Sequence, residues 1–382
     1  MPVTDALLAG LPRMEIRVLG RRLPSYQVCG GTGVVAGVAL ACGLAWRLGL
    51  PPLVVLACAA AAVITSLALA LATRAILQEE HLTFYHHAIA VVAVSALLLA
   101  ALRQPVLGCL DVVVIGLAAV LAVGRAGCLL AGCCYGRPHR WGLRYGAEHV
   151  EEGFPSHLAG VRVAPVQAAE SLLALGLVAG GVVLALDGAP RGTVLAWSAA
   201  GYALGRFGLE LLRGDPERPY AAGFSEAQWT SLLVSAAVAG MALAGLVPRP
   251  WAAAPAPVIL AMAVVAVTGL IGAGRARSLL RPRHVRELAR AAEVASALEL
   301  QDGTVPVVRT SRGVQLSAGR IDAGGGPLQH YALSLADGVL PHAGAVSLAR
   351  LVVELRHSGA RHELVSAGHG VYHLLVHAEA TR

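Results

Sequence analysis

The chain has 382 residues, of which 56% are hydrophobic and 14% are charged. Because soluble chains carry roughly 25% charged residues, this composition excludes a single soluble globule. The formal net charge of +7 comes from Arg alone, since the sequence contains no Lys. In a chain this apolar we attribute the positive charge to membrane loops and lipid headgroups, and we expect no nucleic-acid partner.

Long uncharged tracts predict a protein that crosses a lipid bilayer several times. A helix needs about 20 apolar residues to cross the hydrocarbon core. Windows of this kind lie at residues 26–46, 53–73, 83–102, 105–124, 164–186, 192–212, 227–247 and 252–273. We therefore predict an all-α polytopic membrane protein with seven to eight transmembrane helices. Residues 1–25 form an N-terminal juxtamembrane segment whose charges predict no removable signal peptide.

Two stretches outside the apolar windows differ from the short connections between the others. Within the membrane domain, residues 26–274, the polar and Gly-rich stretch 132–162 predicts a folded extramembrane cap, and loops of this kind often carry sites. Residues 275–382 begin with an Arg cluster and a helical run to about Leu300, followed by the alternating segments VPVVRT, GVQLSA and YALSLA. They predict a small soluble C-terminal α+β domain of unknown role. Its histidines lack a recognised metal-ligand spacing, so we expect no metal there.

Ionisable residues inside the apolar tracts carry the functional argument. A charged side chain costs a few kcal/mol in hydrocarbon, so one that is present usually faces a polar cavity and a partner. The set comprises Asp111, Arg125, Glu170, Arg206, Glu210 and Arg213, with His86 and His87 as titratable additions.

The segment GYALGRFGLELLRGD is the most informative of these tracts. With 3.6 residues per turn, the helix positions Tyr202, Arg206, Glu210 and Arg213 on one face. A glutamate between two arginines can hold both guanidinium forks and leave positive charge for an anion such as a phosphate. The alternative is that these residues lie near a helix end and extend to the membrane interface.

Two further tracts combine polar groups with small residues. In GRAGCLLAGCCYGRP, Arg125 ends an apolar window, and we interpret Cys128, Cys133 and Cys134 as small packing residues, because their spacing matches no recognised zinc or redox motif. In LTFYHHAIAVV, either histidine can act as a base and Tyr85 as a hydrogen-bond donor. An interhelical hydrogen bond is the alternative for the histidine pair.

Taken in order, these motifs resemble the bacterial prolipoprotein diacylglyceryl transferase family over roughly residues 15–250. The family's glycine-rich signature is similar to the positions Gly124, Arg125, Gly127, Gly132 and Gly136, and an earlier family aspartate is similar to Asp111. A second family motif resembles Pro165, Gln167 and Glu170, and a third resembles Tyr202, Arg206, Glu210 and Arg213.

This chain departs from the family pattern at several positions. Cys128, Ala131 and Cys133 stand where the family usually has Asn, Asn and Glu, and Ala164 stands in place of a His. The hydrogen bonds of those side chains are lost. A non-catalytic or re-specified phospholipid-binding relative is therefore one alternative, and a membrane transporter is another, although the sequence has no visible inverted repeat.

The resemblance implies an enzyme that moves the diacylglyceryl group of phosphatidylglycerol to the lipobox cysteine thiol of prolipoproteins and releases glycerol-1-phosphate. The implied catalytic residues are Arg125 and Arg206 as phosphate clamps, Glu210 as the group that orients Arg206 and Arg213, and Tyr85 or His86 for thiol activation. The implied substrate-binding residues are Gly124, Gly127, Gly136, Tyr202, Arg213, Asp111, Gln167 and Glu170. We expect no metal and no cofactor. We further expect a monomer in the bacterial plasma (inner) membrane, with phosphatidylglycerol, prolipoprotein signal peptides and the bilayer as partners.

Overall fold

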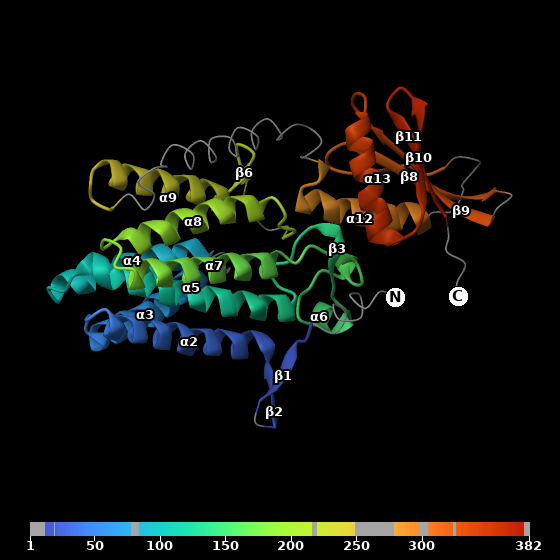
Figure 1. Ribbon diagram of the computed structural model, residues 1–382. Helices are drawn as coiled ribbons and strands as arrows, with labels where there is room; N and C mark the ends of the chain where they lie inside the picture. Colours follow the sequence, from blue (N-terminus) through green and yellow to red (C-terminus); the bar gives the residue numbers. More distant parts are fainter. Residues whose placement is uncertain are drawn as a thin grey trace.

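The computed structural model describes residues 12–18, 20–77, 84–215, 220–248, 279–297, 305–323 and 326–377. Long helices form a bundle at one end of the molecule, and a sheet-rich C-terminal domain lies at the other end (Figure 1). The bundle consists of α2 (Ser25–Arg47), α3 (Pro52–Leu77), α4 (Phe84–Ala101), α5 (Val106–Ala131), α7 (Val166–Leu186), α8 (Thr193–Glu210) and α9 (Glu226–Leu243). A short hairpin of β1 (Glu15–Val18) and β2 (Arg21–Pro24) precedes α2.

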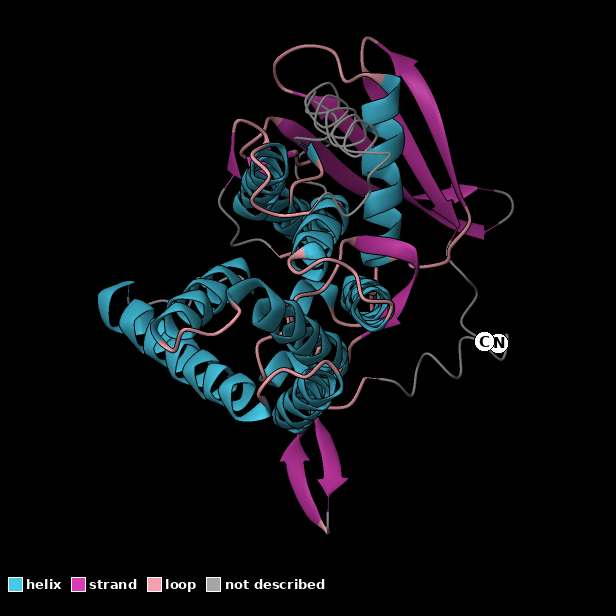
Figure 2. Ribbon diagram, turned by 60° about the vertical axis from the view of Figure 1, so that its left-hand side comes forward, coloured by secondary structure: helices cyan, strands magenta, loops and turns pink. Residues whose placement is uncertain are grey.

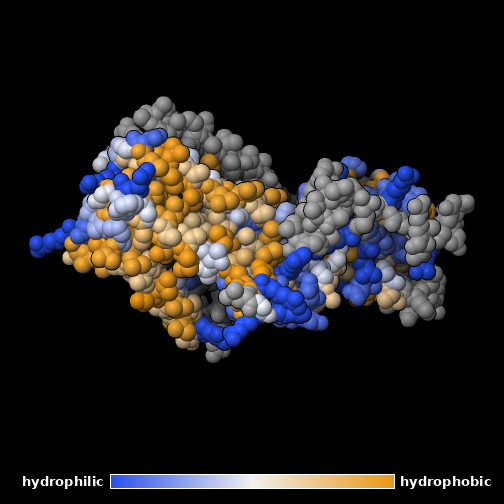
Figure 3. Space-filling model, turned by 60° about the horizontal axis from the view of Figure 1, so that its bottom comes forward, coloured by the Kyte–Doolittle hydropathy of each residue, from blue (hydrophilic) through white to orange (hydrophobic). Residues whose placement is uncertain are grey.

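The outer surface of the bundle is apolar. In α3, the most apolar stretch of 18 residues has a mean hydropathy of 2.5, yet only 11% of this stretch is buried inside the protein. Figure 3 shows this apolar surface along the bundle, with polar residues gathered over the C-terminal domain. A helix whose exposed face is apolar is typical of lipid contact.

Five helices in the described part are long and apolar enough to cross a membrane: α2, α3, α4, α5 and α7. The structure therefore supports a multi-span membrane protein, but it does not confirm the predicted count of seven to eight. Helices α8 and α9 occupy the next two predicted windows without meeting the same criterion. The last window, 252–273, lies outside the described residues.

Helix α5 is the centre of the bundle and packs against α2, α4, α7 and α8. A side chain at Gly116 would lie 2.8 Å from the carbonyl oxygen of Gly37, so α2 and α5 approach closely only because both positions are glycine. The helix continues beyond the predicted limit of residue 124 and ends at Gly132, whose φ of 76° is left-handed. Arg125 therefore lies within the helix, whereas the sequence placed it at the end of a span.

Between α5 and α7 the region predicted as a cap, residues 132–162, folds into short strands and helices. It consists of β3 (Pro138–Arg144), α6 (Ala147–Glu151), the 3-10 helix η1 (Ser156–Leu158) and β4 (Arg162–Val163). Tyr135, Tyr145 and Phe154 form part of its buried core. The hydroxyl of Tyr145 donates a hydrogen bond to the carbonyl oxygen of Leu129 at 3.0 Å, which fixes the cap to the last turn of α5.

The C-terminal domain combines two helices with an antiparallel five-stranded sheet of order β10-β11-β9-β8-β7 (Figure 2). Its elements are α12 (Pro282–Ala297), β7 (Val308–Arg309), β8 (Val314–Ala323), β9 (Gly326–Leu335), α13 (His342–Arg356), β10 (His362–Gly368) and β11 (Val371–His377). The register pairs Leu316 with Leu333 and Leu333 with Tyr372 on the face that packs against both helices. The sheet strands agree with the alternating segments of the sequence.

This domain contacts the cap. Leu355 of α13 packs against the buried core of the cap, and Arg144 of β3 donates a hydrogen bond to Ser358 at 3.5 Å. A further contact joins the start of α12 to β5 (Tyr220–Ala221), outside the cap: the guanidinium of Arg281 lies 5.1 Å from the ring centre of Tyr220. Burial, together with Arg286 and Arg290 of α12, lowers the pKa of His157 in the cap.

Candidate functional site

Charged side chains from two helices, α5 and α8, converge on one buried carboxylate, Glu170 of α7. Nε of Arg125 on α5 lies 3.0 Å from Oε2 of Glu170, and Nη1 of Arg206 on α8 lies 3.5 Å from the same oxygen. Nη2 of Arg206 also pairs with Oε2 of Glu210 at 2.9 Å. Because Glu170 is fully buried and Arg206 is 3% exposed, these charges interact with little solvent screening.

Tyr202 completes the set around Glu170. Its hydroxyl donates a hydrogen bond to Oε1 of Glu170 at 2.7 Å, so the carboxylate is held through both oxygens. Tyr202, Arg206 and Glu210 are buried on the same side of α8, as their spacing predicts. The structure thus brings together Arg125 with Glu170 and the three residues of α8.

Arg213 departs from the predicted helical face because α8 ends at Glu210. After the helix the chain turns back and forms an isolated β-bridge between Arg213 and Gly136. A side chain at Gly214 would lie 2.3 Å from the carbonyl oxygen of Gly136, so the two segments cross at backbone contact. The predicted helical position of Arg213 is therefore wrong, although the residue remains next to the end of α5.

The ion pair of Arg213 is with Asp215, where Nε lies 3.0 Å from Oδ2. Burial opposes the charge of Arg213, but the adjacent Asp215 carboxylate outweighs this and raises the pKa of Arg213 above its usual value. In the described part of the chain, each of the three arginines therefore has a carboxylate partner. Glu170 pairs with Arg125, Glu210 with Arg206 and Asp215 with Arg213. The sequence of α8 alone predicted an excess of positive charge. That excess is absent from this set, because Glu170 of a different helix, α7, adds a negative charge.

Tyr85 adjoins this set, whereas His86 points elsewhere. The Tyr85 ring packs edge-on against Tyr202, with ring centres 5.3 Å apart, and its hydroxyl lies 2.7 Å from Oγ of Ser231. Because Ser231 donates its own proton to the carbonyl of Ala227 at 2.8 Å, Tyr85 is the donor in this contact. His86 instead lies 2.9 Å from Glu226 of α9, with both side chains about 40% exposed.

The remaining predicted site residues have mainly packing contacts. A side chain at Gly127 would lie 2.8 Å from Cβ of Cys29, and one at Gly136 would lie 2.3 Å from the carbonyl oxygen of Ala164. Of the three glycines Gly124, Gly127 and Gly136, only Gly124 has open space within 4 Å of its Cβ position. Gly127 and Gly136 therefore permit chain contacts, and Gly124 is the one of the three that a ligand can approach.

Asp111 lies far from the charged set. It precedes Arg125 by fourteen residues on the same helix, which is about 21 Å at 1.5 Å per residue. Its carboxylate accepts hydrogen bonds from the backbone N–H groups of Gly192 at 2.6 Å and Leu195 at 2.8 Å. These are unpaired donors at the start of α8, so Asp111 caps that helix from a neighbouring one.

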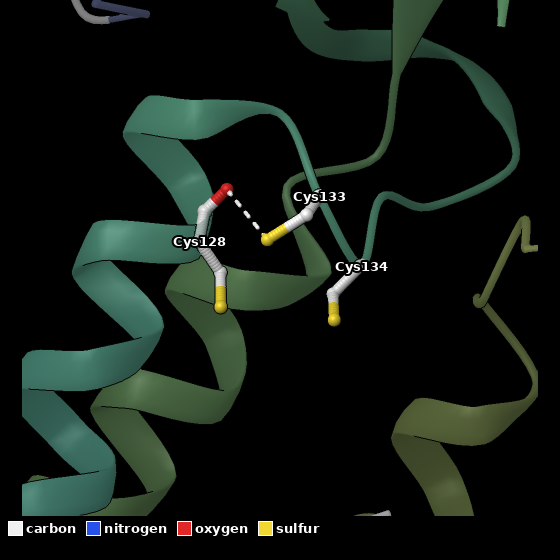
Figure 4. Close-up of side chains that lie close together, drawn as sticks. All are labelled: Cys128, Cys133 and Cys134. Atoms are coloured by element: carbon white, nitrogen blue, oxygen red, sulfur yellow. Dashed lines mark hydrogen bonds between the residues drawn. The ribbon is translucent and has the colours of Figure 1, made fainter. Parts of the chain in front are cut away.

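The three cysteines near the end of α5 also come together. The sulfur atoms of Cys128, Cys133 and Cys134 all lie within 4.8 Å of one another (Figure 4). Gln167 holds this loop through a hydrogen bond from Nε2 to the carbonyl oxygen of Cys133 at 2.8 Å. Hydrogen bonds from the thiols of Cys128 and Cys133, followed by the charges of Arg213 and Arg125, lower the pKa of Cys134.

Sequence reasoning did not identify Ser231 or Glu226, and it interpreted the three clustered thiols as small packing residues. Ser231 and Glu226 contact Tyr85 and His86 from α9, a helix distant in sequence, and no local pattern marks them. The thiols meet because the chain turns back at Gly132 and at Cys134, whose φ of 57° is left-handed. A Gly-Cys-Cys segment directly after a helix was the available signal.

Comparison with known proteins places these observations in a family. The sequence model described as prolipoprotein diacylglyceryl transferase matches residues 26–244, more than half of the chain, from α2 to α9. Phosphatidylglycerol–prolipoprotein diacylglyceryl transferase 2 of Clostridium perfringens is 34% identical over 129 residues, which cover 32% of this chain and 46% of the relative.

Two further relatives, both phosphatidylglycerol–prolipoprotein diacylglyceryl transferases, give similar values. The protein of Dehalococcoides mccartyi (strain ATCC BAA-2100) is 33% identical over 127 residues, 33% of this chain and 47% of the relative. That of Clostridium tetani is 34% identical over 128 residues, 33% of this chain and 49% of the relative. The chain spans about half the length of the curated relatives it matches.

Proposed function

We propose, because the chain belongs to the prolipoprotein diacylglyceryl transferase family, that it transfers the diacylglyceryl group of phosphatidylglycerol to the lipobox cysteine thiol of prolipoproteins. The observation that carries this proposal is the convergence of Arg125 and Arg206, from two helices, on Glu170 inside an apolar bundle. A buried pair of guanidinium groups suits the phosphate of a lipid that enters from the bilayer.

The reaction is a displacement at the carbon of the diacylglyceryl group that bears the phosphate. The acceptor thiolate forms a C–S bond to this carbon, the C–O bond breaks, and glycerol-1-phosphate leaves with the electron pair. Fixed positive charge near the leaving phosphate stabilises the negative charge that develops on it. The thiol proton must pass to a base before or during the attack.

The charge balance of the resting site determines how the phosphate binds. A guanidinium group has five N–H donors, of which Arg125 directs Nε to Glu170. We assign its remaining donors, with Arg206, to the phosphate of the lipid. Glu210 then positions Arg206, while Asp215 positions Arg213 at the edge of the site. Because Arg125 and Arg206 share Oε2 of Glu170, the phosphate gives these two guanidinium groups a further negative partner.

Tyr85 is our first candidate for thiol activation, because its hydroxyl lies beside the charged set and is oriented by Ser231. His86 is the second, since its pairing with Glu226 is the arrangement of an imidazole held to accept a proton. Tyr202, Gln167 and Gly124 line or support the lipid site in this proposal, and Gly127 and Gly136 maintain its walls. Asp111 acts at a distance by capping the start of α8.

We place the chain in the bacterial plasma (inner) membrane as a multi-pass monomer. In this proposal α8 and α9 cross the bilayer together with the five apolar helices, which gives at least seven spans. The acyl chains of the donor lipid and the apolar part of the signal peptide then lie in the bilayer, and the phosphate and the thiol meet at the cap end of the bundle.

The decisive experiment uses cells depleted of their own transferase. Expression of the parent chain is expected to restore prolipoprotein lipidation, measured as the mass of a reporter lipoprotein. Arg125→Ala and Arg206→Ala are expected to abolish the rescue, and Arg74→Ala, an exposed arginine of α3, serves as the matched control. Full rescue by both variants removes the arginines from the mechanism, and failure of the parent contradicts transfer.

A second candidate is a relative that binds phospholipid without transferring it. The observation that favours it is the replacement of the family's polar signature residues by Cys128, Ala131 and Cys133. Native mass spectrometry of the detergent-purified chain separates the two. Retention of phosphatidylglycerol without release of glycerol-1-phosphate in the presence of a lipobox peptide supports the second candidate.

A further inference from the structure

The transfer reaction proposed above uses none of the three clustered thiols. Its nucleophile belongs to the acceptor, and its charge stabilisation comes from guanidinium groups. Cys128 is on the last turns of α5, and Cys133 and Cys134 follow in the loop. Figure 4 shows their sulfur atoms around one shared space beside the end of the helix.

The donor set has the chemistry of a soft-metal site. Thiolates select zinc and similar ions over magnesium or calcium. Zinc–sulfur bonds of about 2.3 Å in a tetrahedron place two sulfur atoms about 3.8 Å apart. The sulfur atoms lie within 4.8 Å of one another, so no pair is more than about 1 Å wider apart than this spacing. Vicinal cysteines such as Cys133 and Cys134 are poorly placed to form a disulfide with each other.

We propose that Cys128, Cys133 and Cys134 bind one divalent metal ion of the zinc class through three thiolates. The fourth tetrahedral position remains open to water or to an incoming thiol. Each thiol releases one proton to solvent on binding, and no oxidation or reduction takes place. The proposal is independent of the transfer activity, because it concerns only the ligands and the ion.

The surroundings hold the three ligands in place. Gly132 and Cys134 adopt left-handed backbone conformations, and Gln167 anchors the carbonyl of Cys133, so the loop is held in the folded-back shape. Three thiolates and a divalent ion carry one net negative charge. Arg213 adjoins this loop through its β-bridge with Gly136, and its guanidinium is paired with Asp215.

The test uses the full chain purified in detergent, stripped with a chelator and titrated with Co²⁺. We expect one Co²⁺ per chain, with the intense sulfur-to-cobalt charge-transfer absorption of a thiolate site, and displacement of the Co²⁺ by Zn²⁺. Cys128→Ala, Cys133→Ser and Cys134→Ser are each expected to weaken Co²⁺ binding by about tenfold or more, since changes in the outer shell alone cost that much. Cys42→Ser, outside the cluster, is the matched control.

A measurement on the parent chain guards against variants that fail to fold. Bound Zn²⁺ is expected to protect three thiols per chain from alkylation, and peptide mapping is expected to identify them as the clustered ones. The proposal is overturned if the parent binds no Co²⁺, if Cys42→Ser loses binding equally, or if two of the three thiols are found joined in a disulfide.

Discussion

Arg125 and Arg206 share one oxygen atom of Glu170, with Nε of Arg125 at 3.0 Å and Nη1 of Arg206 at 3.5 Å. Two like charges from separate helices are therefore held together by one buried carboxylate. Removing the carboxylate leaves both guanidinium groups in a site with little access to water. A phosphate carries negative charge on several oxygens, so it can compensate both guanidinium groups when Glu170 is removed.

Glu170→Gln is expected to lower the stability of the bundle by about 3–5 kcal/mol, the usual cost of removing one partner of a buried ion pair. Thermal unfolding in detergent measures this change, and Glu152→Gln in the exposed part of the cap is the control. Added phosphatidylglycerol is expected to restore more stability to Glu170→Gln than to the parent. An equal response of both chains contradicts the assignment of the phosphate to these arginines.

Tyr85→Phe and Ser231→Ala separate the chemistry of the phenol from its packing. Both changes remove the 2.7 Å hydrogen bond, but only the first removes the hydroxyl. If Tyr85 assists the thiol, Tyr85→Phe is expected to lower kcat by about 10²-fold, the lower end for general acid–base groups, with KM for the lipid unchanged. Ser231→Ala retains most of the activity. Equal losses in the two variants assign Tyr85 to structure, and a larger loss in His86→Gln transfers the role to the histidine.

The order of the helices and the convergence of Arg206 and Glu210 with Tyr202 were predictable from periodicity. Apolar windows locate α2 to α9 to within a few residues, except that α5 continues past Arg125 to Ala131. That error has a local cause, because the small apolar residues after Arg125 continue the helix until the left-handed Gly132. Hydropathy cannot separate the end of an apolar window from the end of the helix that contains it.

Pairings between distant helices were not predictable from spacing. Local periodicity assigned Glu210 to both Arg206 and Arg213, whereas Asp215 pairs with Arg213 after the chain turns back. The thiol cluster needs the same turn, together with the left-handed conformation of Cys134. The sequence pattern determines which residues share a helix face, but the partners across the bundle depend on how the helices are packed.

Asp111→Asn tests whether this residue binds substrate or caps a helix. The asparagine keeps one acceptor oxygen but loses the charge and one of the two hydrogen bonds to the start of α8. We expect a loss of about 0.5–2 kcal/mol in stability, the range for helix caps, and no change in KM for phosphatidylglycerol. Thermal unfolding and lipid titration give the two values. A raised KM at unchanged stability restores Asp111 to the substrate site.

His284 predicts how the C-terminal domain responds to acid. Its Nδ1 donates to the carbonyl of Leu279 at 2.6 Å, and Nε2 accepts from the hydroxyl of Thr310 at 2.8 Å, so the neutral ring satisfies both partners. Burial lowers the pKa of His284 below its usual value of 6.5. The unfolded chain therefore binds the proton more readily than the folded one, and stability falls as pH drops below about 6.5, by up to about 1.4 kcal/mol per pH unit.

Hydrogen exchange of α12 and β8, corrected for the intrinsic rate at each pH, measures this loss between pH 7 and pH 5. His284→Asn keeps a donor for Leu279 but does not titrate, so it is expected to be less stable at pH 7 and to show a shallower decline in acid. Part of the decline remains, because burial also lowers the pKa values of His330 and His357 in the same domain. An unchanged slope in His284→Asn assigns the acid response to those two histidines.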